Sequence, residues 1–117
     1  MPIDLRPLTG RWVNYDKQST GISRIEIDNW EGLPTVRVLG AGRPDPIDWG
    51  EVAGIAFVDG YNGMETVAFT ANYYLAFVQV LLTGYLDKRR LLVDAYSIFT
   101  DASGRASYFH RDSFYLQ

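Results

Sequence analysis

The sequence predicts an all-β domain, an eight-stranded antiparallel up-and-down β-barrel that spans residues 1–117. Three observations predict this fold. The long segments are rich in β-branched and aromatic residues, they alternate with a period of two, and turn residues interrupt them at short intervals. Short connections favour antiparallel neighbours, and eight such strands close into a barrel that holds side chains or one small ligand. A sandwich of two sheets is the alternative fold, although no loop looks long enough to cross between sheets.

Turn and loop residues separate the strands in order. The polar loop 16–20 ends the first strand, Glu31-Gly32 turns the chain after the second, and the glycines and prolines of 40–46 exclude that segment from a ladder. The fourth strand is expected to bend at Gly50 or Gly54. The predicted strands are residues 10–15, 22–28, 34–39, 48–58, 65–74, 77–86, 91–99 and 106–116.

The second half of the chain carries three further turn signals. Asp59-Gly60 and Asn62-Gly63 are strong turn dipeptides within residues 59–63, and residues 87–89 form a short charged connection. The segment 100–104 contains Asp, Ser and Gly and is predicted to close the last hairpin. Each of these segments is short, which keeps the last four strands antiparallel.

Composition excludes several classes of function. The chain has no cysteine, so it has no disulfide, thiolate metal site or cysteine nucleophile, which fits a cytoplasmic location. With 14 acidic and 11 basic residues, the net charge of −3 argues against nucleic-acid binding. The start of the chain shows no signal peptide, and no apolar stretch reaches the about 20 residues that a membrane span needs. No motif for a cofactor or phosphate group is present.

The segment Leu8-Thr9-Gly10-Arg11-Trp12-Val13-Asn14 resembles the first strand of the lipocalins and the wider calycin superfamily, and also that of avidins. Together with Asp48-Trp49-Gly50 and the last hairpin, it is similar to small bacterial lipocalin-like proteins. The resemblance implies a barrel built around a small-molecule cavity. It also implies that Trp12 closes one barrel end beneath a stacked guanidinium from Arg111 or Arg105, and that Asn14 contacts the ligand.

The last two predicted strands carry the candidate catalytic residues. Asp94 and Tyr96 share one face of the first of them, and Tyr108 and His110 share one face of the second. If both faces point inward, a carboxylate, two phenols and an imidazole line the lumen and form an acid–base site. Alternation fixes which residues share a face but not which face is inside, so the alternative is that these side chains lie in solvent.

Aromatic and uncharged polar residues are the candidates for ligand binding. They are Trp12, Asn14, Trp49, Asn72 and Gln79. Polar groups within apolar strands need partners, which are either each other or a ligand. Trp49 is either a lid at the barrel mouth or a structural anchor. A single histidine and the absence of a calcium-loop spacing argue against a metal site.

Three functions are compatible with these features. The first is binding of a small hydrophobic or aromatic molecule in the barrel cavity. The second is a cofactor-independent isomerase or cyclase, in which replacing Asp94 by Asn would stop turnover. The third is a solid barrel that acts as a protein-interaction module. The predicted strand 77–86 is largely apolar on both faces, so a homo-oligomer that buries the outer face of strands 65–74 and 77–86 is also expected.

Overall fold

The computed structural model describes residues 3–42 and 44–117, so Arg43, in the predicted loop 40–46, and the first two residues lie outside the described residues. All regular structure in the described part is β. The strands are β1 (Gly10–Asn14), β2 (Ile22–Trp30), β3 (Leu33–Gly40), β4 (Ile47–Ala53), β5 (Ile55–Val58), β6 (Thr66–Leu75), β7 (Val78–Asp87), β8 (Arg90–Phe99) and β9 (Tyr108–Leu116). The described residues contain no helix long and apolar enough to cross a membrane.

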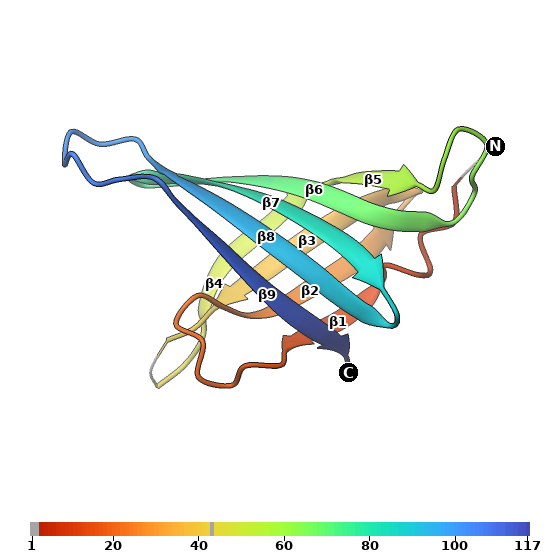
Figure 1. Cartoon of the computed structure of the whole chain (residues 1–117), viewed down its shortest axis with the longest axis horizontal. Coiled ribbons are helices and arrows are strands. Elements are labelled where there is room, and N and C mark those ends of the chain that lie inside the picture. The colour runs from red at the N-terminus through yellow and green to blue at the C-terminus, as the bar shows by residue number, and fades with distance from the viewer. Residues whose placement is uncertain (1–2, 43) are drawn as a thin grey trace.

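The strands form one antiparallel sheet in the order β4-β3-β2-β1-β9-β8-β7-β6-β5. The sheet curls into a nearly closed up-and-down barrel, with β6–β9 in front of β2–β4 in Figure 1. The predicted barrel is therefore confirmed, but it is described by nine strands rather than eight. The predicted fourth strand divides at Gly54 into β4 and β5, which are the two edges of the sheet.

The seam of the barrel lies between these two edges. Gly54 N–H donates to the carbonyl oxygen of Pro34 at 2.9 Å. The Tyr73 hydroxyl lies 2.9 Å from the carbonyl oxygen of Val36 and 2.8 Å from that of Gly50, so β6 is tied to β3 and β4. Gly50 has φ of +90° beside an irregularity in the β3–β4 pairing, a conformation that glycine adopts at low cost. A side-chain bridge therefore replaces the missing ladder at the seam.

The inward-facing side chains fill one half of the barrel. The fully buried members of this core include Leu8, Ile25, Val36, Leu82 and Phe114. The N-terminal segment covers this end of the barrel, where the backbone of Asp4 pairs with the start of β6. The end is therefore closed by the chain itself.

The opposite end of the barrel is open and asymmetric. The strands β6–β8 have ten residues each, whereas β1 has five. The hairpins β6–β7 and β8–β9 consequently project beyond the other strands, as Figure 1 shows, and the molecule extends over 46 × 28 × 23 Å. We call this projecting part of β6–β9 the overhang. Within the described residues no strand faces the inner side of the overhang, which roofs the open end.

Candidate functional site

A cavity of about 320 Å³ lies at the open end, beneath the overhang. Strands from both sides of the barrel and the loops before β2 and after β3 contribute to its walls. Its lining residues are Thr20, Gly21, Ile22, Gly40, Ala41, Ile47, Trp49, Val80, Val93, Ala95, Ser97, Tyr108, His110, Asp112 and Phe114. The lining combines apolar and aromatic side chains with polar ones, a mixture that is typical of small-molecule sites. The polar side chains are those of Thr20, Ser97, Tyr108, His110 and Asp112.

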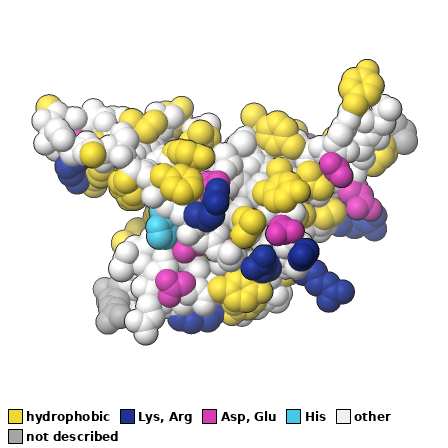
Figure 2. Space-filling model, viewed as in Figure 1, with side chains coloured by type: hydrophobic (Ala, Val, Ile, Leu, Met, Phe, Trp, Pro, Cys, Tyr) yellow, Lys and Arg dark blue, Asp and Glu magenta, His cyan; other side chains and the backbone are white. Residues whose placement is uncertain are grey.

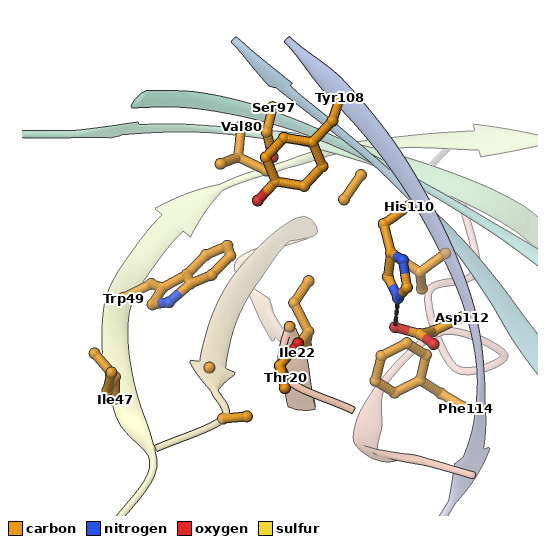
Figure 3. Close-up of a pocket in the computed structure, with 15 residues that line it drawn as sticks. Thr20, Ile22, Ile47, Trp49, Val80, Ser97, Tyr108, His110, Asp112 and Phe114 are labelled. Atoms are coloured by element: carbon orange, nitrogen blue, oxygen red, sulfur yellow. Dashed lines mark ion pairs between the residues drawn. The ribbon is translucent and has the colours of Figure 1, made fainter. Parts of the chain in front are cut away.

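The cavity has two chemically different walls. Figure 3 shows Trp49 of β4 on one side and His110 of β9 on the other, with the ring of Tyr108 reaching down from the overhang between them. Ile22 and Phe114 lie on the opposite side of the space from Tyr108. A flat molecule placed here would meet aromatic rings on two sides and an imidazole on a third.

The position of Trp49 depends on Gly40, its neighbour on β3. A Cβ atom on residue 40 would lie 2.6 Å from the indole nitrogen of Trp49, so the ring occupies the space that any larger residue would fill. The indole also packs edge-on against Tyr73, with ring centroids 5.5 Å apart and an interplanar angle of 74°. Trp49 is thus both a wall of the cavity and part of the packing at the seam.

The closest contact between polar side chains in the cavity lining joins His110 and Asp112, both on β9. His110 Nε2 lies 3.0 Å from Asp112 Oδ2. The two residues are two positions apart, so alternation places both side chains on the same face of the strand. The Asp112 side chain is only 14% exposed, whereas that of His110 is 52% exposed at the cavity mouth, where Figure 2 shows the imidazole below the overhang. A shielded carboxylate therefore holds an imidazole that ligands can reach.

The structure places the four predicted catalytic residues on opposite faces of the sheet. In the β8–β9 register, Ala95 pairs with His110 and Asp94 pairs with Arg111. Tyr108 and His110 therefore point into the cavity, whereas Asp94 and Tyr96 lie on the outer face. The expectation that all four line one lumen is wrong, because the register joins odd positions of β8 to even positions of β9.

Asp94 has a different partner on the outer face. Arg111 donates from Nε to Asp94 Oδ1 at 2.6 Å and from Nη2 to Oδ2 at 3.0 Å, and these hydrogen bonds raise the pKa of the guanidinium. The Arg111 guanidinium also lies over the Phe109 ring, 5.5 Å from its centroid. Asp94 is consequently committed to a surface ion pair with a bidentate geometry.

Trp12 is buried at 2% exposure, and its Nε1–H donates to the carbonyl oxygen of Leu8 at 2.8 Å. The expected guanidinium stack on this ring is not formed. Arg111 lies on the outer face, and Arg105 lies over Phe99 in the overhang, 4.1 Å from the ring centroid. The indole instead packs in the core near the closed end and does not line the cavity.

Asn14 points inward but has its own backbone partners. Its Nδ2 donates to the carbonyl oxygen of Ile22 at 2.8 Å, and its Oδ1 accepts from the backbone N–H of Asp16 at 2.8 Å. It borders a second hollow, of about 380 Å³, which is lined by the polar loop after β1 and by the loop after β3. The Asn14 side chain therefore links β1 to the start of β2 by hydrogen bonds, and it lies outside the cavity lined by His110.

Asn72 and Gln79 lie on the outer face of the sheet. Asn72 is exposed, and the Gln79 amide donates to the Tyr74 hydroxyl at 3.4 Å. Neither belongs to the cavity, so the expectation that they orient a ligand in the lumen is wrong. The buried residues Ala71, Tyr73 and Val80, next to them in the chain, take the inward positions.

Of the nine predicted site residues, three line the cavity: Trp49, Tyr108 and His110. Sequence reasoning assigned no role to Asp112, although its position two residues after the single histidine places both on one face of the same strand. Within residues 3–42 and 44–117, no group of three or more His, Asp and Glu side chains is arranged to hold a metal ion.

No protein-family model, curated protein or solved structure matches this chain. The likeness of its first strand to lipocalins and avidins therefore stays a prediction. The described residues form a nearly closed, antiparallel, up-and-down barrel with one packed end and one hollow end.

Proposed function

We propose that the chain binds a small, flat, apolar or aromatic molecule in the cavity beneath the overhang. The observation that carries the proposal is a cavity walled by the rings of Trp49, Tyr108 and Phe114, with the His110–Asp112 contact on one wall. The volume of about 320 Å³ is at the lower end of the range of small-molecule sites, about 300–1,000 Å³. The ligand therefore carries one or two rings.

Trp49 provides a direct readout of binding. We expect 2-naphthol, a neutral two-ring probe, to change the tryptophan fluorescence saturably and to raise the melting temperature. Trp49→Phe should remove the fluorescence change but keep the rise in melting temperature. Native mass spectrometry of protein purified from its own host would identify the natural ligand if it copurifies.

A cavity-filling variant separates this site from other apolar surfaces. Ala95 lines the cavity and is the β8 residue that pairs with His110 on the neighbouring strand β9. Ala95→Phe therefore places a ring in the cavity. Ala102→Phe is the matched control, because Ala102 is exposed in the loop between β8 and β9. Loss of 2-naphthol binding in Ala95→Phe alone supports the proposal. Equal binding by both variants would contradict it.

We further propose that the outer face of β7–β9 joins two copies of the chain. Tyr85, Tyr96 and Phe109 are 41–56% exposed on this face, and Figure 2 shows hydrophobic side chains gathered there around charged ones. Asp94 and Arg111 lie among them and neutralise each other, so this pair adds no net charge that would repel a second copy. This surface shares β7, the predicted strand 77–86, with the expected oligomer surface and adds β8 and β9. The expected contribution of strand 65–74 stays a prediction.

Sedimentation measurements test the dimer. Tyr96→Lys should shift the protein to a monomer, because the Tyr96 ring packs against Phe109 at a centroid distance of 5.2 Å in the middle of this face. Tyr61→Lys, at a loop position that is 99% exposed, is the control and should leave the mass unchanged. A monomeric wild-type protein at high micromolar concentration would refute self-association.

A further inference from the structure

The contact between His110 and Asp112 determines which nitrogen of the imidazole carries the proton. An ionised carboxylate only accepts hydrogen bonds, so the imidazole nitrogen beside it, Nε2, carries the proton. In the neutral ring the lone pair then resides on Nδ1. Nδ1 is a proton acceptor on a side chain that lines a mostly apolar cavity, and the carboxylate stabilises the imidazolium that forms when Nδ1 takes up a proton.

The surroundings of the ring favour a reacting role over simple surface solvation. Asp112 is largely shielded, and it comes from the same strand as His110, so the pair needs no loop movement to form. Gly21 faces the ring from the start of β2, where a Cβ atom would lie 3.9 Å from His110 Cδ2. The Tyr108 phenol, two residues before His110 on the same face, reaches into the same space in Figure 3.

From this geometry we propose that the cavity is a proton-transfer site for carbon acids, in which His110 is the general base and Asp112 is its positioning residue. The proposal rests on the proposed small-molecule site and assigns its substrate class, namely flat conjugated carbonyl compounds. His110 Nδ1 removes a proton from the carbon next to the carbonyl group. The electron pair of the broken C–H bond forms a C=C bond, and the carbonyl π pair moves to oxygen, giving an enolate.

The rest of the cycle uses groups that are already in the cavity. The Tyr108 hydroxyl, on the same face of β9 as His110, is a donor for the enolate oxygen. The His110 imidazolium then returns its proton to a different carbon of the conjugated system, the carbonyl group re-forms, and the double bond has moved. Atoms and electrons balance without a cofactor, so the reaction class is an isomerisation.

A probe reaction tests the base without knowledge of the natural substrate. In 5-nitrobenzisoxazole, a base removes the C–H proton, the freed electron pair completes a nitrile and the N–O bond breaks to release a coloured phenolate. We expect saturable turnover, faster than that of the same concentration of free imidazole. General bases contribute about 10²–10⁴-fold, so His110→Gln should lose at least about 100-fold in kcat. Asp112→Asn should lower kcat about 10-fold, with KM changed less than about twofold.

Asp94→Asn is the matched control, because it removes a carboxylate of the same kind from the outer face. It should leave turnover unchanged, in contrast to the expectation from sequence alone. A second readout reports on Asp112 directly. His110 is the only histidine, so the imidazole ¹⁵N signals in labelled protein are unambiguous. The wild type should show protonated Nε2 and free Nδ1, and Asp112→Asn should shift the proton towards Nδ1, because the Asn amide can donate to Nε2.

The outcomes separate this proposal from the binding proposal. Turnover that depends on His110 and Asp112 but not on Asp94 supports proton transfer. Turnover that survives His110→Gln, or turnover no faster than that of free imidazole in a protein that binds 2-naphthol, overturns proton transfer and leaves the binding function standing. Absence of both turnover and 2-naphthol binding overturns both.

Discussion

The Tyr73 hydroxyl is the most informative single group to remove, because it bridges the seam where the sheet has no ladder. Tyr73 is 2% exposed, and its oxygen lies within 2.9 Å of two backbone carbonyl oxygens, one on β3 and one on β4. Tyr73→Phe keeps the ring and leaves both carbonyl oxygens without this partner. An unsatisfied buried group costs about 1–3 kcal/mol, so we expect the free energy of unfolding to fall by that amount at neutral pH.

The same group predicts how the effect depends on pH. Burial raises the pKa of Tyr73 from 10.0 to about 12. The unfolded chain therefore releases this proton near pH 10, whereas the folded chain keeps it until about pH 12. The folded state binds more protons in that window, so the stabilisation is complete below pH 10 and is lost as the pH rises towards 12. At pH 11 the loss is about 1.4 kcal/mol, one pKa unit of the shift.

The assay is urea unfolding of wild type and Tyr73→Phe at pH 8 and pH 11, followed by tryptophan fluorescence. The difference in unfolding free energy between the two proteins should narrow by about 1.4 kcal/mol at the higher pH. Subtracting the variant removes the contributions of the other tyrosines and the lysines. Tyr61→Phe, in an exposed loop, should match the wild type at both values. The free energies of unfolding of wild type and Tyr73→Phe could instead differ by the same amount at pH 8 and pH 11. That result would refute the conclusion that the Tyr73 hydroxyl is the buried group that bridges the seam.

Three further substitutions test the packing and the turns, each by thermal or urea unfolding. Gly84→Ala places a Cβ atom 2.1 Å from the buried ring of Phe69, so we expect a loss of about 1–3 kcal/mol, partly recovered when Phe69→Leu is added. Lys88 and Arg89 both have positive φ in the β7–β8 turn, at +52° and +69°, and replacing them by Asn-Gly should stabilise by about 1 kcal/mol or more; an unchanged midpoint would contradict this strain. Asn14→Ala removes the side-chain hydrogen bonds that link β1 to the start of β2, and it should lower the free energy of unfolding by about 1–3 kcal/mol. An unchanged free energy of unfolding would mean that water replaces these hydrogen bonds.

The strand pattern could be predicted from the sequence because it depends on local signals. Turn residues separate most of the predicted strands, and the turn at Glu31-Gly32 has positive φ at both positions, as the favoured hairpin turns require. The division of the fourth strand at Gly54 has a spatial cause. A Cβ atom there would lie 3.0 Å from the carbonyl oxygen of Thr70. The bend is therefore caused by the close approach of β6, a strand that is distant in the sequence.

The face that each strand turns inward could not be predicted, because the alternation in β8 is ambiguous. Leu92 and Ile98 make its outer face as apolar as the inner face formed by Leu91 and Val93. Which residues of β8 lie beside His110 depends on the β8–β9 register. The sequence leaves that register undetermined, because β9 begins only at Tyr108, later than the predicted start of the last strand at residue 106. In the observed register Ala95 lies beside His110. A shift by one residue would place Asp94 there instead, and the acid of the candidate site would then be a different residue.

The overhang has a consequence for local unfolding. Its strands are supported by cross-strand pairs and by the rings of Phe77 and Phe99, stacked with centroids 6.4 Å apart. In the part of the chain that the structure describes, no second sheet covers its inner face. Amide hydrogen exchange along β8 should therefore be slow near Leu91 in the core and faster towards Phe99. The roof of the cavity can then fray as a separate cooperative unit while the packed half of the barrel stays folded, so exchange of a bound molecule with solvent would not require global unfolding.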